Sequence, residues 1–173
     1  VADHPDAPCF RYLGARFTYR NVGAIVNKVA AGMQDLGIGP GVNVGLLMPN
    51  SLYFVLCYYA ILKAGATVVN YNPLSATDEI VHQALDSDTR FLVTLDVEAL
   101  SAKVEAVLQR MPLVKLILCH PTDILPMPHR LVFRLMRRRR AATCPVTKDG
   151  DCRLTSLLAG NRRLRPVDVR PLE

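Results

Sequence analysis

One stretch in the first half of the chain decides the fold, residues 42–73, VNVGLLMPNSLYFVLCYYAILKAGATVVNYNP. It opens with a compact apolar run at 42–48, continues into an apolar helical segment at 52–63 that Ser51 is placed to cap, and ends in a β-branched run at 67–70. Both short runs are mainly apolar rather than alternately polar, so both faces of each strand are expected to be covered. This pattern predicts a parallel strand–helix–strand unit.

Strands and helices continue to alternate on both sides of this unit. The expected elements are a hairpin over 9–18 with its turn at Gly14, helices over 19–36, 76–85 and 98–110, and strands over 91–94 and 114–119. Thr18 is placed to cap the first of these helices, and Ser75 with Asp78 has capping-box spacing for the second. The sequence therefore predicts an α/β fold, a mainly parallel sheet with helices on both faces.

The pattern changes after residue 120, where prolines at 121, 126 and 128 interrupt the chain. Beyond them we expect a helix at 129–140, a loop at 143–151, a short helical turn at 154–158 and an extended linker at 162–173. We therefore divide the chain into an α/β subdomain with its N-terminal hairpin, residues 1–120, and a second region, residues 121–173.

Positive charge is concentrated in that second region. The formal net charge is +6, yet residues 1–128 hold nine Lys and Arg against eleven Asp and Glu, and residues 129–173 hold twelve against four. The expected helix at 129–140 carries most of the excess, at Arg130, Arg134, Arg137, Arg138, Arg139 and Arg140. Three interpretations stay open: a solvated surface helix, a helix on an anionic membrane surface, and a nucleic-acid contact, the weakest because few aromatic residues are interleaved.

Composition excludes several classes of protein. Apolar residues make up 50% of the chain and charged residues 21%, which is typical of a folded domain. No apolar stretch reaches the roughly 18 residues of a membrane span, and no signal peptide is recognisable. Five cysteines without a C-x-x-C pair indicate reduced thiols. We expect a cytoplasmic protein, peripheral at the inner face of the membrane if the basic helix binds there.

The residues themselves offer no catalytic, cofactor-binding or metal-binding constellation. The glycine-rich run at 37–41 follows a helix and precedes a strand, whereas a phosphate-cradling loop follows a strand and opens a helix. The four histidines lack metal-ligand spacing, and no G-x-S-x-G elbow is present. We therefore assign no catalytic residue, cofactor site or metal site to this chain.

Several segments in order resemble the acyl-CoA synthetases of the adenylate-forming superfamily. They are His4-Pro5-Asp6-Ala7-Pro8 with Phe17-Thr18-Tyr19, Gly45-Leu46-Leu47-Met48-Pro49-Asn50-Ser51, and Leu62-Lys63-Ala64-Gly65-Ala66 with Asn72-Pro73-Leu74. The combination looks most like the N-terminal part of bacterial long-chain fatty acid–CoA ligases. Asn21 stands where this family usually has Glu, which predicts a weaker capping box after Thr18.

The resemblance implies a reaction whose machinery lies elsewhere. Members of the family use ATP and Mg²⁺ to convert a carboxylate into an acyl-adenylate, then transfer the acyl group to CoA. The family's phosphate loop, adenine segment, ribose-binding Asp and catalytic Lys have no counterpart before Glu173. The chain thus resembles a fragment open at both ends and is expected to be inactive alone. Its implied partners are the remainder of the synthetase, a fatty acid and CoA.

One position within the chain is a candidate for contact with substrate. Asn70, Tyr71, Asn72 and Pro73 lie at the end of a strand, at the edge where parallel sheets usually place ligands, although a simple turn is the more common role for such residues. A missing partner should also leave sheet edges and apolar surface uncovered, which predicts limited stability or a homo-oligomer. The alternative is a free-standing α/β module that docks on a membrane or nucleic acid through 129–140.

Overall fold

A computed structural model describes residues 3–127, 129, 151–160 and 162–168 of the chain. Nearly all of the expected basic helix at 129–140 lies outside these described residues, together with its arginines and the expected loop at 143–150. The three interpretations of that tract stay predictions. All structural statements below concern the described ranges.

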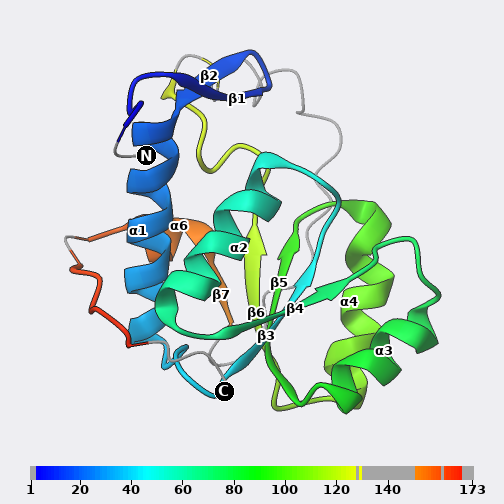
Figure 1. Ribbon diagram of the computed structural model, residues 1–173. Coiled ribbons are helices and arrows are strands. Elements are labelled where there is room, and N and C mark those ends of the chain that lie inside the picture. Colours follow the sequence, from blue (N-terminus) through cyan, green and yellow to red (C-terminus); the bar gives the residue numbers. More distant parts are fainter. Residues whose placement is uncertain (1–2, 128, 130–150, 161, 169–173) are drawn as a thin grey trace.

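A five-stranded, wholly parallel sheet lies at the centre of the molecule (Figure 1). In spatial order its strands are β4 (Thr67–Tyr71), β3 (Asn43–Leu47), β5 (Thr89–Leu95), β6 (Lys115–Cys119) and β7 (Cys152–Arg153). The first four confirm the predicted strands to within two residues. The two-residue β7 was not predicted, because a strand this short leaves no hydrophobic period to detect.

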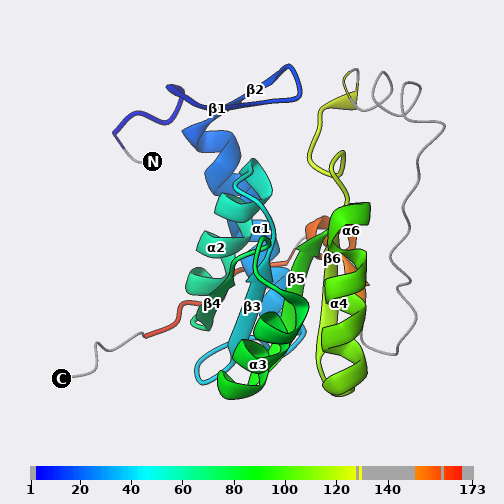
Figure 2. The same cartoon turned by 90° about the vertical axis from the view of Figure 1, so that its right-hand side faces the viewer.

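Helices cover both faces of the sheet, as the uniformly apolar strands predicted. Helices α1 (Tyr19–Asp35), α2 (Leu52–Ala64) and α6 (Leu154–Leu158) lie on one side, and α3 (Thr77–Asp86) and α4 (Glu98–Arg110) on the other (Figures 1 and 2). From β3 the chain steps outward to β4 and then back across β3 to β5. Right-handed crossovers in opposite directions must use opposite faces, which puts α2 and α3 on different sides.

The N-terminal hairpin forms as predicted and lies at the start of α1. Strands β1 (Pro8–Tyr12) and β2 (Ala15–Thr18) pair antiparallel, with Gly14 at the turn in the left-handed region, φ +81°. The ring of Tyr12 packs edge-on against the buried Tyr53 of α2, with ring centroids 5.8 Å apart. This contact ties the hairpin to the main body.

The capping box before α1 forms with Asn in place of Glu. The Thr18 hydroxyl accepts from the Asn21 N–H at 3.3 Å, and the Asn21 side-chain oxygen accepts from the Thr18 N–H at 3.0 Å. The reciprocal box is therefore complete. The neutral amide oxygen lacks the added strength of a charged acceptor, so the weakening expected from the sequence stays a prediction.

The capping box predicted before α3, from Ser75 and Asp78, was wrong. The helix begins at Thr77, with Ala76 as an N-cap that makes no side-chain hydrogen bond. Asp78 instead forms an ion pair with Arg110 of α4, with 2.8 Å between the nearest oxygen and nitrogen. The spacing alone could not foresee that a neighbouring helix would offer the carboxylate another partner.

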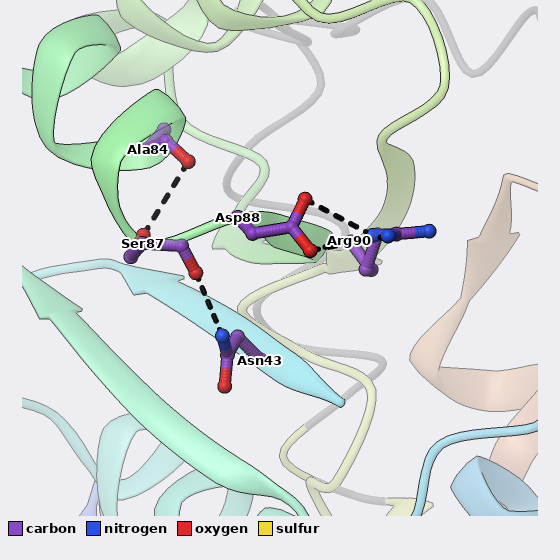
Figure 3. A network of polar contacts seen from close by, with 5 residues as sticks. All are labelled: Asn43, Ala84, Ser87, Asp88 and Arg90. Carbon is purple, nitrogen blue, oxygen red and sulfur yellow. Dashed lines mark hydrogen bonds and ion pairs between the residues drawn. The ribbon is translucent and has the colours of Figure 1, made fainter. Parts of the chain in front are cut away.

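The centre of the sheet depends on a glycine in β3. Gly45 lies beneath the ring of Tyr71 from the edge strand β4, so close that a Cβ atom on Gly45 would overlap the ring. The Tyr71 hydroxyl reaches across β3 and hydrogen-bonds with Ser87, at 3.1 Å, and with Thr89 at the start of β5. Figure 3 shows Asn43 of β3 donating to the Ser87 carbonyl at the same edge, at 2.7 Å.

Replacing Gly45 by Ala should lower the free energy of unfolding by about 1–3 kcal/mol, because the added methyl group forces the Tyr71 ring out of its place. Urea denaturation followed by circular dichroism measures the change. Gly39→Ala is the matched control, since a Cβ there meets only the Ala64 carbonyl oxygen at 3.7 Å. Equal effects of the two substitutions would contradict the proposed packing.

Candidate functional site

A cavity of about 470 Å³ lies at the carboxyl ends of β3 and β4. All four residues that the sequence singled out, Asn70, Tyr71, Asn72 and Pro73, line it. Two contributions were not predicted, namely the segment 48–50 after β3 and the Phe54 ring from α2. The signal for them was present, because residues after adjacent parallel strands meet at one edge of a sheet.

The strand order places this cavity next to the point where the chain reverses direction. The reversal occurs at β3, which has β4 on one side and β5 on the other. At its carboxyl end the two central strands are joined by the buried Thr94 hydroxyl, which donates to the Leu47 carbonyl at 2.7 Å. Ligands of open α/β sheets bind outside the carboxyl ends near such a point. The cavity occupies the β4 side of it.

The side chains around the cavity suit binding rather than acid–base chemistry. None of its lining residues carries a charge, and the polar groups are the amides of Asn50, Asn70 and Asn72. Tyr71 contributes no hydroxyl, because its O–H is held by Ser87 and Thr89 at the opposite edge of the sheet. The arrangement can hold an uncharged or apolar group and orient it through amide hydrogen bonds.

The loop that follows β4 is held in a defined conformation. We call residues 72–76 the rim loop. The Asn72 side-chain oxygen accepts from the Leu74 N–H at 3.0 Å, and its carbonyl accepts from the Ser75 N–H at 3.1 Å. This turn presents the Leu74 side chain outward, 89% exposed.

Two buried groups near α2 that could be mistaken for reactive ones are inert. The thiols of Cys57 and Cys119 lie 3.9 Å apart and fully buried. Their shared hydrogen bond and the burial raise the pKa of Cys119, so the nucleophilic thiolate does not form. Burial likewise raises the pKa of Tyr53, whose hydroxyl accepts from the Ile124 N–H at 3.2 Å.

Two further kinds of site are recognised by their geometry, a metal centre and a membrane-spanning helix. Over the ranges that the structure describes, no three histidine, cysteine or acidic side chains gather into a group able to hold a metal ion. Within the same ranges no helix is long and apolar enough to cross a bilayer. Cys9, Cys57, Cys119 and Cys152 are all free thiols.

The segment at 162–168, predicted as an extended linker, is extended but docked on the body. The side-chain amide of Gln34 in α1 pairs with both backbone groups of Arg165: it donates to the carbonyl at 2.9 Å and accepts from the N–H at 2.9 Å. Asp35 forms ion pairs with Arg162 and Arg165, at 3.1 and 3.7 Å. We call this the Gln34 clamp.

Two glycines let the C-terminal segments approach closely. A Cβ on Gly65 would come within 2.5 Å of Val167, and one on Gly32 within 2.9 Å of Leu157. Gly65 has a second role, because it also ends α2 in the left-handed region with φ +88°. Gln34 itself is only 8% exposed, and a buried amide needs hydrogen-bond partners, which the backbone of Arg165 provides.

The family is decided by a match that covers most of the chain. A family model described as AMP-binding enzyme matches residues 1–136. The chain belongs to this family. The resemblance noted from the sequence is thereby confirmed.

Curated relatives of the chain are CoA ligases. A long-chain-fatty-acid–CoA ligase of Bacillus subtilis (strain 168) is 27% identical over 143 residues, covering 81% of this chain and 25% of that protein. One of Escherichia coli O157:H7 is 38% identical over 94 residues, covering 54% and 17%. 4-Coumarate–CoA ligase 5 of Oryza sativa subsp. japonica is 33% identical over 96 residues, covering 54% and 18%. The chain thus spans a quarter or less of the length of these AMP-binding relatives.

Solved structures of AMP-binding enzymes share the fold. A benzoate CoA ligase from Burkholderia xenovorans LB400 superposes with a TM-score of 0.62 at 20% identity, over 68% of this chain and 24% of that one. Coronafacic acid ligase from Pectobacterium brasiliense reaches 0.71 at 12% identity, over 95% and 29%. At such identities the likeness establishes the fold.

Replacing Gln34 by Leu should release the docked segment, because both backbone groups of Arg165 lose their partner while the helix keeps a side chain of similar size. Trypsin cleaves after Arg162 and Arg163, whereas the bond between Arg165 and Pro166 resists it. We expect cleavage at these two sites to be about tenfold faster, the effect of about 1.4 kcal/mol on local opening.

Gln109→Leu on the exposed side of α4 is the matched control, since Gln109 bonds only to Glu105 in its own helix at 3.2 Å. If both variants are cleaved at the rate of the unchanged chain, the Gln34 clamp does not hold the segment.

Proposed function

We propose that this chain is the N-terminal structural part of a long-chain fatty acid–CoA ligase. The observation that carries the proposal is the identity of 36–38% to bacterial long-chain-fatty-acid–CoA ligases across about half of the chain. The apolar, uncharged cavity at the sheet edge agrees with an acyl substrate. In the whole enzyme a fatty acid would be activated with ATP to an acyl-adenylate and then joined to CoA.

In this proposal the role of the chain is structural. Catalysis of the adenylation step needs preorganised donors and a metal to stabilise the charge of the reacting phosphoryl group. The described residues around the cavity supply amides and apolar walls instead. ATP, Mg²⁺ and CoA would therefore be held by the remainder of the synthetase chain. The cavity at 48–54 and 70–74 would form one wall of the substrate channel.

The purified chain should give no ATP–pyrophosphate exchange above background with hexadecanoate, since it supplies none of the charge-stabilising groups. The matched measurement uses the whole synthetase that contains this segment, which should exchange readily. Exchange by the chain alone would overturn the proposed division of labour.

Substrate class is tested separately on the whole synthetase. We expect kcat/KM for hexadecanoate to exceed that for benzoate and for 4-coumarate by at least about tenfold, a difference of about 1.4 kcal/mol in transition-state binding. A preference for an aromatic acid would remove the long-chain assignment and leave membership of the AMP-binding family intact.

A second function is favoured by the charge of residues 129–173, twelve basic against four acidic side chains. We propose that the arginine-rich tract at 129–140 brings the protein to anionic membrane surfaces. Vesicles containing phosphatidylglycerol should sediment the chain at low salt, and replacing Arg137 to Arg140 by Gln should abolish sedimentation. Unchanged sedimentation of that variant removes the membrane role, and retention on RNA instead would favour the nucleic-acid alternative.

A further inference from the structure

The rim loop is fastened from outside by a single lysine. The Lys103 ammonium, on α4, lies 2.5 Å from the Pro73 carbonyl oxygen and 2.6 Å from the Ser75 carbonyl oxygen. Lys103 and the loop are thirty residues apart in sequence, and Lys103 is half-buried. Both carbonyls therefore turn towards α4 rather than towards solvent.

This contact differs from an ordinary surface ion pair. The ammonium donates to two neutral backbone acceptors in one loop, so it fixes the orientation of two peptide units at once. Such charge-assisted hydrogen bonds are stronger than bonds between neutral groups. Without Lys103 the two carbonyls would face the flank of α4 with their principal donor removed, which is costly for partly buried acceptors.

The loop that Lys103 holds is also the edge of the cavity. Asn72, Pro73 and Leu74 all line it, and the turn at Asn72 ends at Ser75, whose carbonyl the lysine binds. A shift of the Pro73 or Ser75 peptide would therefore move the Asn72 amide, one of the polar groups at the cavity. Lys103 itself is not among the residues that line the cavity, so it would act on a bound molecule through the loop.

We propose that Lys103 is a positioning residue for the cavity: it holds the rim loop against α4 and so sets the place of Asn72 and Pro73. Its effect on substrate rests on the proposed function, in which this cavity forms a wall of the acyl channel. Lys103 takes no part in the chemistry.

A merely structural role, in which Lys103 only joins α4 to the rest of the fold, predicts a different result. The ion pair between Arg110 and Asp78 also joins α4 to its neighbour, α3, yet it does not contact the rim loop. Arg110→Met is therefore the matched control for Lys103→Met. Each substitution removes one cationic link of α4 and keeps an unbranched side chain.

The first test uses this chain and amide hydrogen exchange. In Lys103→Met the amides of Leu74 and Ser75 should exchange at least about tenfold faster, which corresponds to about 1.4 kcal/mol of local opening, while those of β3 and α1 keep their rates. Arg110→Met should leave Leu74 and Ser75 unchanged. Unchanged rim amides in Lys103→Met, or equal effects of both variants, overturn the proposal.

Lys103→Arg provides a second variant should Lys103→Met fold poorly. It keeps the charge, but its longer side chain presents the donors in a fixed planar fork, which fits two carbonyls placed for a compact ammonium less well. It should restore part of the protection of Ser75. Exchange rates identical to those of the original chain would overturn the two-carbonyl geometry on which the proposal depends.

The second test uses the whole synthetase that contains this segment. Lys103→Met should raise KM for hexadecanoate about tenfold and change kcat less than twofold, because a displaced wall weakens binding in ground and transition states alike. A loosened rim with unchanged KM would support the positioning of the loop and overturn the channel role of the cavity. Equal losses in kcat for Lys103→Met and Arg110→Met would instead indicate general destabilisation and overturn the proposal.

Discussion

The packing of the Tyr71 ring over Gly45 is the contact on which the arrangement of the sheet depends. Strand β3 is hydrogen-bonded to a neighbour on each side and covered by helices on each face. Only a residue without a side chain leaves space there for an aromatic ring. Through that space the hydroxyl of the edge strand β4 reaches Ser87 and Thr89, beyond β3. The edge strand is thus anchored to the strand on the far side of its own neighbour.

This anchor determines what the carboxyl edge can offer. Tyr71 directs its only polar atom to the amino-terminal edge of the sheet, so the cavity at the other end keeps an apolar wall and the amides of its asparagines. The rim loop begins immediately after Tyr71, and its position follows from two restraints at its ends. Tyr71 fixes the loop where it leaves β4, and Lys103 fixes it before α3 begins.

Local pattern was enough to predict the elements, because each depends on neighbours in sequence. The apolar runs at 42–48 and 67–70 form strands, and the segment between them forms α2 with Ser51 as its cap, the Phe54 N–H donating to it at 3.3 Å. The predictions fail where a residue distant in sequence competes for a side chain. The Asp78 carboxylate was expected at its own helix N-terminus but binds Arg110, and the Gln34 amide binds a backbone 131 residues away. No period or capping rule contains that information.

The same distinction explains how much of the site was foreseeable. Asn70 to Pro73 could be predicted because parallel strands place their carboxyl ends together, a rule that needs only strand order. Lys103 could not, since a lysine on a helix is most often solvated, and its role appears only when α4 lies against the rim loop. Positioning residues of this kind are recognised by their acceptors, here two neutral carbonyls with no side chain to mark them in the sequence.

The Gln34 clamp and the Lys103 contacts hold two irregular stretches of this chain by the same means. Gln34 binds the backbone of the docked segment, which fixes the direction of the chain, and Asp35 adds ion pairs to its Arg162 and Arg165 side chains. Lys103 likewise binds the backbone of the rim loop, at the Pro73 and Ser75 carbonyls. In both places a side chain of a helix replaces the hydrogen bonds that regular structure would have provided. Irregular segments are thereby held in defined positions, as the channel wall that we propose would require.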